Sequence, residues 1–204
     1  MTCIVLADLH LDMYLNQGLD PFAEIPASEF EGITHCIIAG DLSNKAHKQW
    51  NRCFPWIADR FPYAQLYVLP GNHDYYDFRI DDEKRLVEIS ENHDVAFVQK
   101  SQLILGRQRI LFSTLWTDFE IYGDRTANMQ TAARVMSDYH YIKVARNNFR
   151  RLSPVQTAAI HSDHCNWLAT HLAEPFDGDT TVVTHHAPHR AALGVQSRHL
   201  VDRI

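Results

Sequence analysis

Four short motifs along the chain carry side chains that bind metal ions and transfer protons. In order, they are Asp8-Leu9-His10, Gly40-Asp41, Gly71-Asn72-His73-Asp74 and Thr184-His185-His186. Together they supply carboxylates, an amide oxygen and imidazoles from four distant places in the chain. Asp41 can bridge two cations through its two oxygens, since two-metal hydrolases hold their ions roughly 3.5–4 Å apart. The set therefore predicts a two-metal hydrolytic centre.

The individual side chains suggest different roles in such a centre. Asp8 and His10 are two residues apart, so one loop can present both, and a mixed oxygen and nitrogen set suits Mn, Fe or Zn. Asn72 offers a neutral carbonyl oxygen, which leaves His73 beside it to face a substrate. Asp74 can hydrogen-bond the imidazole of His73 and raise its pKa. His73 would then be a good general acid for a leaving alkoxide.

Each motif follows a stretch that we expect to be a buried β-strand. Continuous apolar runs of this kind suit strands covered on both faces, and they occupy residues 3–7, 35–39, 66–69 and 181–183. Helices are predicted near residues 45–60 and 79–93. Alternation of strands and helices indicates an α/β domain, in which ligands bind at the carboxyl ends of the strands.

The middle of the chain has a different pattern of apolar residues. Apolar runs at 95–98, 103–105 and 109–112 predict a hairpin. Ser153-Pro154 is a helix start signal, and the helix is expected to extend to about His171. Three histidines of that helix are expected on an exposed polar face: His161, His164 and His171.

Composition narrows the class of protein. The 204 residues suit one domain, and the chain is 46% hydrophobic and 22% charged, as in soluble globular proteins. A net charge of −6 without a long basic run argues against nucleic-acid binding. No segment is apolar enough to span a bilayer. Four cysteines without metal-binding or disulfide spacing favour a reduced, cytoplasmic setting.

The ordered motifs make the chain resemble the calcineurin-like metallophosphoesterases. That family's pattern is Asp-x-His, Gly-Asp-x-x-(Asp/Asn), Gly-Asn-His-(Asp/Glu), an isolated His after a strand, and Gly-His-x-His. The first four elements match here at Asp8/His10, residues 40–44, residues 71–74 and His185. Residues 115–119 and 184–188 also resemble a bacterial branch of small cytosolic members. The resemblance implies an αββα fold, a β-sandwich flanked by helices on both sides.

The resemblance also implies an activity: hydrolysis of phosphomonoesters or phosphodiesters by a metal-bound hydroxide. It assigns Asp8 and His10 to a first metal, Asp41 to a bridge, and Asn72 and His185 to a second metal. The cofactors would be two divalent ions (Mn, Fe or Zn). Two further site residues follow from the same pattern, namely the general acid His73 and its partner Asp74.

One element of the family pattern is missing, because no Gly-His-x-His follows His185. We therefore expect a single domain, residues 1–204, that is C-terminally incomplete and lacks strands of the sandwich. The chain is then a fragment of a longer enzyme, or His189, His199 or water replaces a ligand, or a second chain or oligomer completes the sheet. An ending such as residues 198–204, which looks like an interrupted helix, favours the fragment.

Two functions remain open on the sequence. The first is a metal-dependent phosphoesterase acting on a phosphorylated small molecule or a phosphodiester, with residues 115–150 as a lid or substrate-facing insert. The second is an inactive protein of the same fold that acts as a binding module. The retained motif residues favour the enzyme, since a scaffold needs none of them.

Overall fold

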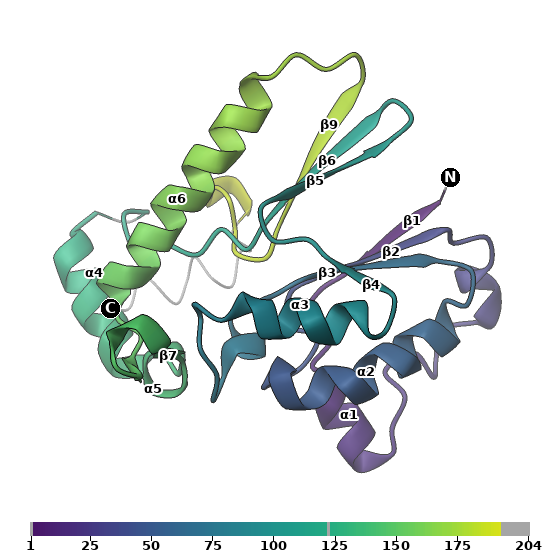
Figure 1. The fold of residues 1–204 in the computed structure, drawn as a ribbon, viewed down its shortest axis with the longest axis horizontal. Coiled ribbons are helices and arrows are strands. Elements are labelled where there is room, and N and C mark those ends of the chain that lie inside the picture. The colour runs from purple at the N-terminus through teal and green to yellow at the C-terminus, as the bar shows by residue number, and fades with distance from the viewer. Residues whose placement is uncertain (1, 122, 193–204) are drawn as a thin grey trace.

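The first half of the chain forms a parallel sheet in the computed structural model, which describes residues 2–121 and 123–192. Its strands are hydrogen-bonded in the order β1-β2-β3-β4 (Figure 1). They are β1 (Cys3–Leu6), β2 (His35–Ala39), β3 (Gln65–Leu69) and β4 (Val95–Phe97). All three pairings are parallel, so the carboxyl ends of the strands meet at one edge. This confirms the predicted mixed α/β fold and shows that its first sheet is parallel.

Three helices connect these strands and lie on one side of the sheet (Figure 1). They are α1 (Leu11–Gln17), α2 (Ala46–Arg60) and α3 (Glu83–Glu91). The buried positions of α2 include Trp50, Phe54 and Ile57, which recur at helical spacing on one face. That face packs in a large core cluster that also holds Cys36, Ile38 and other sheet residues.

The second sheet has the strand order β5-β6-β9. The predicted hairpin forms between β5 (Ser101–Leu105) and β6 (Gln108–Ser113), whereas residues 95–97 join the first sheet instead. Strand β9 (Asp179–Thr184) pairs with β6 in parallel, with Thr184 opposite Ser113. Among the described residues, β9 has no strand on its other side.

The two sheets share a core. One buried cluster combines side chains of both sheets, among them Ile37 and Leu69 from the first and Phe112 and Val183 from the second. The other side of the second sheet packs on α6 (Pro154–Ala173), where Leu111 and Leu168 lie in one cluster. Helices therefore lie outside each sheet (Figure 1).

Residues 125–151 form a group of short elements beside the sheets. They are α4 (Arg125–Val135), α5 (Asp138–Tyr141), β7 (Lys143–Val144), η3 (Ala145–Asn147) and β8 (Arg150–Arg151). The remaining short helices are η1 (Ala27–Phe30), η2 (His73–Tyr75) and η4 (Arg190–Ala192). No described helix combines the length and hydropathy needed to cross a membrane.

Helix α6 begins at the predicted residue, but a histidine expected on its exposed face is buried. Ser153 and Gln156 form a capping box, with Pro154 in the first turn. His164, expected on an exposed face, is instead buried, and its Nδ1 accepts the backbone N–H of Leu115 at 3.2 Å. The expectation failed because the loop after β6 crosses this face of the helix, and helical periodicity does not reveal such a contact.

We expect the buried His164 to make folding sensitive to acid. Burial lowers its pKa to about 4, whereas an unfolded chain has a histidine pKa of about 6.5. The neutral ring therefore stabilises the fold fully above pH 6.5, and this contribution, roughly 3 kcal/mol at most, is lost as the pH falls through 4. His164→Asn keeps an acceptor that does not titrate, so its free energy of unfolding should fall less between pH 6.5 and 4.5. Urea titrations measure this.

The matched control is His140→Asn, since His140 is exposed on α5. It should keep the pH dependence of the unsubstituted protein. Equal pH dependence of the His164 and His140 variants would contradict a buried neutral His164.

Candidate metal centre

The loops that follow the strands are tied to one another. The backbone N–H of Asp8 donates to the carbonyl of Gly40 at 3.1 Å, and that of His10 donates to the carbonyl of Asp41 at 3.0 Å. The loop after β1 thus continues to pair with the loop after β2. His185 directly follows β9 and brings a fourth strand end to the same place. The four motifs, far apart in sequence, meet at one edge of the fold.

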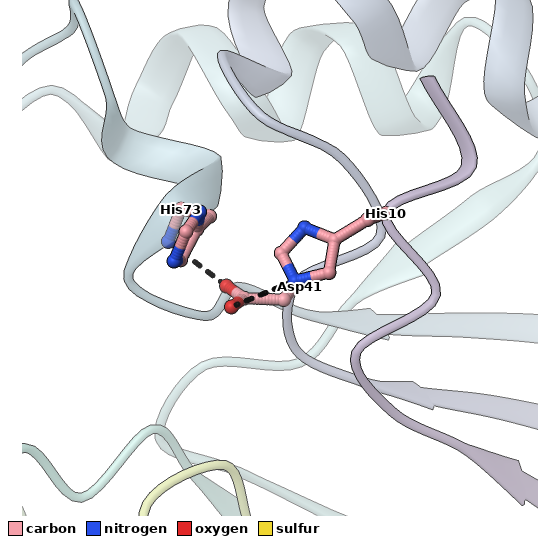
Figure 2. A group of neighbouring side chains, drawn as sticks. All are labelled: His10, Asp41 and His73. Atoms are coloured by element: carbon pink, nitrogen blue, oxygen red, sulfur yellow. Dashed lines mark hydrogen bonds and ion pairs between the residues drawn. The ribbon is translucent and has the colours of Figure 1, made fainter. Parts of the chain in front are cut away.

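Asp41 lies at the centre of this group. Its Oδ1 accepts the backbone N–H of His73 at 2.9 Å. Its Oδ2 lies 3.9 Å from Nε2 of His10 and 3.6 Å from Nε2 of His185. Figure 2 shows the carboxylate between His10 and His73. Two sets of side chains each bring their potential ligand atoms within 4.8 Å of one another. The sets are His10–Asp41–His73 and Asp8–Asp41–His185, and Asp41 belongs to both.

A second cluster of ligand atoms forms around His185. Its Nδ1 lies 3.0 Å from the carbonyl oxygen of Ala39, which only accepts, so Nδ1 carries the proton. In the neutral ring, Nε2 then presents a lone pair. It faces Oδ1 of Asn72 at 3.1 Å and Oδ2 of Asp41 at 3.6 Å. A backbone carbonyl that orients a histidine in this way is typical of metal-binding imidazoles.

These atoms fit a cation better than they fit one another. In the neutral ring, Nε2 of His185, Oδ1 of Asn72 and Oδ2 of Asp41 are three acceptors facing each other without a proton. Buried acceptors without donors are unfavourable unless a positive charge binds between them. Nitrogen and oxygen donors together suit Mn, Fe or Zn.

The backbone of the site is closely fitted and strained. Asp8, His10 and Asp41 have φ angles of 53°, 43° and 54°, in the left-handed region. Each costs about 1–2 kcal/mol relative to an ordinary conformation. Gly40 approaches the imidazole of His185 so closely that a Cβ would overlap it, and a Cβ on Gly71 would overlap the carboxylate of Asp41. Glycine is needed at both positions for the ligand atoms to converge.

Burial and neighbouring charges shift the pKa values of the site's carboxylate and imidazole groups. Burial raises the pKa of Asp41, the hydrogen bond from His73 lowers it, and the nearby carboxylates of Asp8 and Asp138 raise it further. Burial lowers the pKa of His73, and the neighbouring His10 acts in the same direction. The carboxylates repel one another, and the pKa of the His73 imidazole is lowered. Divalent cations bound here would relieve the repulsion and favour the deprotonated ligands.

The structure corrects the role expected for Asp74. Its buried carboxylate does not contact the imidazole of His73. Instead, Oδ2 accepts the backbone N–H groups of Asp41 and Gly71 at 2.9 Å each, and Oδ1 accepts Ser43 N–H at 3.2 Å and Trp50 Nε1–H at 3.0 Å. With both oxygens occupied, Asp74 holds the loops after β2 and β3 together.

The imidazole of His73 has another partner. Its Nδ1 lies 2.9 Å from Oδ1 of Asn44, whose amide nitrogen donates to the carboxylate of Asp12 at 3.3 Å. That contact fixes the amide, so Asn44 accepts and His73 Nδ1 carries the proton. Nε2 of His73 is left as the atom that can exchange a proton. Neither Asn44 nor Asp12 could be assigned this role from the sequence, because the chain positions that meet here depend on tertiary folding.

The sequence also missed Asp138. This buried residue of α5 accepts hydrogen bonds from the amide of Asn72 and from Tyr76. It lies in a polar segment without a recognisable pattern, so no signal was available. Of the two proposed substitute ligands, His189 is exposed and belongs to neither set of ligand atoms. His199 lies outside the described residues.

A cleft of about 700 Å³ lies beside residues 186–190, which directly follow the ligand candidate His185. Its wall includes His186, which follows the ligand candidate His185, and Trp116, whose ring centroid lies 5.1 Å from that of His186. Burial lowers the pKa of His186 to about 4, so its ring is neutral near pH 7. The wall also carries the charged residues Asp118, Glu120 and Arg190, and none of the candidate metal ligands lines it.

Comparisons with known proteins bear on the family and the fold of the chain. The model of a family described as calcineurin-like phosphoesterase matches residues 1–203. A comparison with curated proteins gave no match. Among solved structures, the crystal structure of phosphopantetheinyl hydrolase from Mycobacterium tuberculosis is similar, with a TM-score of 0.63 and 16% sequence identity. The similarity covers 91% of this chain and 68% of that chain. At this identity, the similarity shows a shared fold.

Asp74→Asn should destabilise the protein strongly. The amide replaces one acceptor oxygen with a donor, which would face two backbone N–H groups or two other donors. We expect a loss of about 3 kcal/mol in the free energy of unfolding, since hydrogen bonds to buried charges are among the strongest. Urea unfolding monitored by circular dichroism measures it.

Asp59→Asn provides the control, because Asp59 is exposed on α2. Its effect should stay within roughly 0.5 kcal/mol. A loss below about 1 kcal/mol for Asp74→Asn would mean that this carboxylate does not hold the loops.

Proposed function

The chain belongs to the calcineurin-like phosphoesterase family, and we propose that it is a metal-dependent hydrolase of phosphomonoester or phosphodiester bonds. The observation that carries this proposal is the shared position of Asp41 in two sets of ligand atoms. A carboxylate common to two sets is what a pair of neighbouring cations requires. The acceptors that face one another around His185 support the same conclusion.

Five side chains would hold two divalent ions of Mn, Fe or Zn. We propose Asp41 as the shared ligand, with Asp8, His10, Asn72 and His185 completing the two sites. The ligand atoms of Asp8 lie near those of His185 and Asp41, whereas His10 belongs to the other set. Experiment must therefore decide which of these side chains binds which ion. When bound, such ions supply an activated water and neutralise charge on the phosphoryl oxygens.

We propose His73 as the group that gives a proton to the leaving oxygen. Asn44 fixes its Nδ1 proton, which leaves Nε2 to carry the transferred proton. Burial and His10 lower the pKa of this ring, whereas an anionic phosphoester next to Nε2 would favour its protonated form. The substrate would thus bring about the protonation that its own hydrolysis needs.

The substrate is proposed to be a phosphorylated small molecule or a phosphodiester. The cleft beside His186, of about 700 Å³, is large enough for the group attached to the phosphate. A solved structure with the same fold is named phosphopantetheinyl hydrolase, which supports a small phosphorylated molecule as the class to test. A complete β-sandwich with helices on both sides, the lid role of residues 115–150 and a cytoplasmic location stay predictions.

The first test is hydrolysis of bis(4-nitrophenyl) phosphate with added Mn²⁺. The unsubstituted chain should turn over the ester, and a chelator should stop it. Asp41→Asn should lower turnover by at least about 1000-fold, because both ions lose their shared ligand. Asp59→Asn should leave turnover unchanged. A fully active, chelator-sensitive Asp41→Asn would overturn the assignment, and an inactive, folded parent chain would favour a binding module.

His73→Asn should separate proton transfer from metal binding. With a phenyl leaving group, which needs a proton, turnover should fall by roughly 100- to 10,000-fold. With the far less basic 4-nitrophenolate, the loss should be much smaller. Mn²⁺ binding should stay near that of the parent protein, because the backbone N–H that contacts Asp41 is retained. An equal loss for both esters, together with weakened Mn²⁺ binding, would make His73 a ligand.

A further inference from the structure

Asp138 is a buried carboxylate that touches the candidate metal centre from a distant part of the chain. It is the first residue of α5, and only 2% of its surface is exposed. Its Oδ1 accepts two hydrogen bonds of 2.8 Å, from the amide nitrogen of Asn72 and from the hydroxyl of Tyr76. These contacts span more than sixty residues of sequence. A carboxylate is buried here only with such compensation.

The first contact determines which end of the Asn72 amide faces the centre. A carboxylate accepts and does not donate, so the NH₂ end must point toward Asp138. The oxygen end then points toward His185, at 3.1 Å from its Nε2. If the amide were reversed, its oxygen would lie against a carboxylate oxygen, and an NH₂ group, which binds no cation, would face the centre. Asp138 therefore selects the orientation of Asn72 that can ligate.

Asp138 does not act as a ligand itself. It belongs to neither set of ligand atoms found among the described residues. Its second hydrogen bond holds Tyr76, whose ring stacks on His73 with centroids 4.3 Å apart. The hydroxyl of Tyr76 donates to the carboxylate, which only accepts. The carboxylate thus orients one candidate ligand and supports the packing of His73.

Helix α5 is docked independently of Asp138. The backbone N–H of Asp77 donates to the carbonyl of Tyr141 at 3.0 Å. Farther along, the carboxylate of Asp81 accepts the backbone N–H groups of Ala145 and Arg146 at 2.7 and 2.9 Å. The segment that carries Asp138 would therefore stay anchored if the side chain of Asp138 were removed. Asp81 offers a matched carboxylate that anchors the segment and does not touch the centre.

We propose that Asp138 is a positioning residue that sets the affinity for the cation held by Asn72 and His185. The inference rests on the proposed function, because it requires that these residues bind metal. A partner that orients a ligand typically accounts for a 10- to 100-fold effect on metal affinity. By reciprocity, an ion bound at Asn72 strengthens the contact between α5 and η2. Residues 137–144 then belong to the metal centre as well as to the insert.

Isothermal titration with Mn²⁺ tests this without an activity assay. The parent chain should bind two ions. Asp138→Ala should keep one site unchanged and weaken the other by about 10- to 100-fold. Asp138→Asn, whose oxygen still accepts from Asn72 and Tyr76, should recover most of that affinity, and it guards against misfolding of the alanine variant. Asp81→Ala should leave both sites unchanged.

Three results would overturn the inference while the proposed function stands: two unchanged sites in Asp138→Ala, equal weakening in Asp81→Ala, or no recovery in a folded Asp138→Asn. The second result would trace the effect to a loosened segment, and the third to lost charge rather than to orientation. A parent chain that binds no Mn²⁺ would overturn the proposed function and this inference with it. Circular dichroism of every variant separates these results from unfolding.

Discussion

The buried carboxylate of Asp74 is the constraint on which the site depends. It accepts four N–H groups, from Asp41, Ser43, Trp50 and Gly71, and so joins the loops after β2 and β3 to helix α2. Parallel strands bring their carboxyl ends to one edge, but they do not fix the loops beyond. Asp74 fixes them, and the positions of the shared carboxylate and of the amide ligand candidate both follow from it.

The arrangement of ligand atoms that these loops hold is unfavourable without a cation. When the His185 ring is neutral, acceptor atoms of Asp41, Asn72 and His185 face one another, and three residues adopt left-handed backbone conformations. Strain and unpaired polar atoms of this kind persist where the surrounding structure holds them, and they concentrate at functional sites. The fold contributes stability through its three buried clusters, and part of that stability is lost to keep the site in this arrangement.

The sequence predicted the strands, the main helices and the convergence of the four motifs, because each motif directly follows an apolar strand. It could not predict the partners of the site residues. Asp74 binds loop backbones instead of His73. Asn44 orients the ring of His73, and Asp138 orients the amide of Asn72. These contacts join residues from different elements and depend on side-chain positions that periodicity does not encode. His164 shows the same limit, since a crossing loop buries it.

The central claim is that Asp41 is shared by two bound cations. Crystals grown with Mn²⁺, with anomalous diffraction data collected near the manganese edge, test it most directly. The account predicts two anomalous peaks roughly 3.5–4 Å apart, both within ligand distance of the Asp41 carboxylate, with Asn72 and His185 at one of them. A single peak, or peaks that do not contact Asp41, would contradict it.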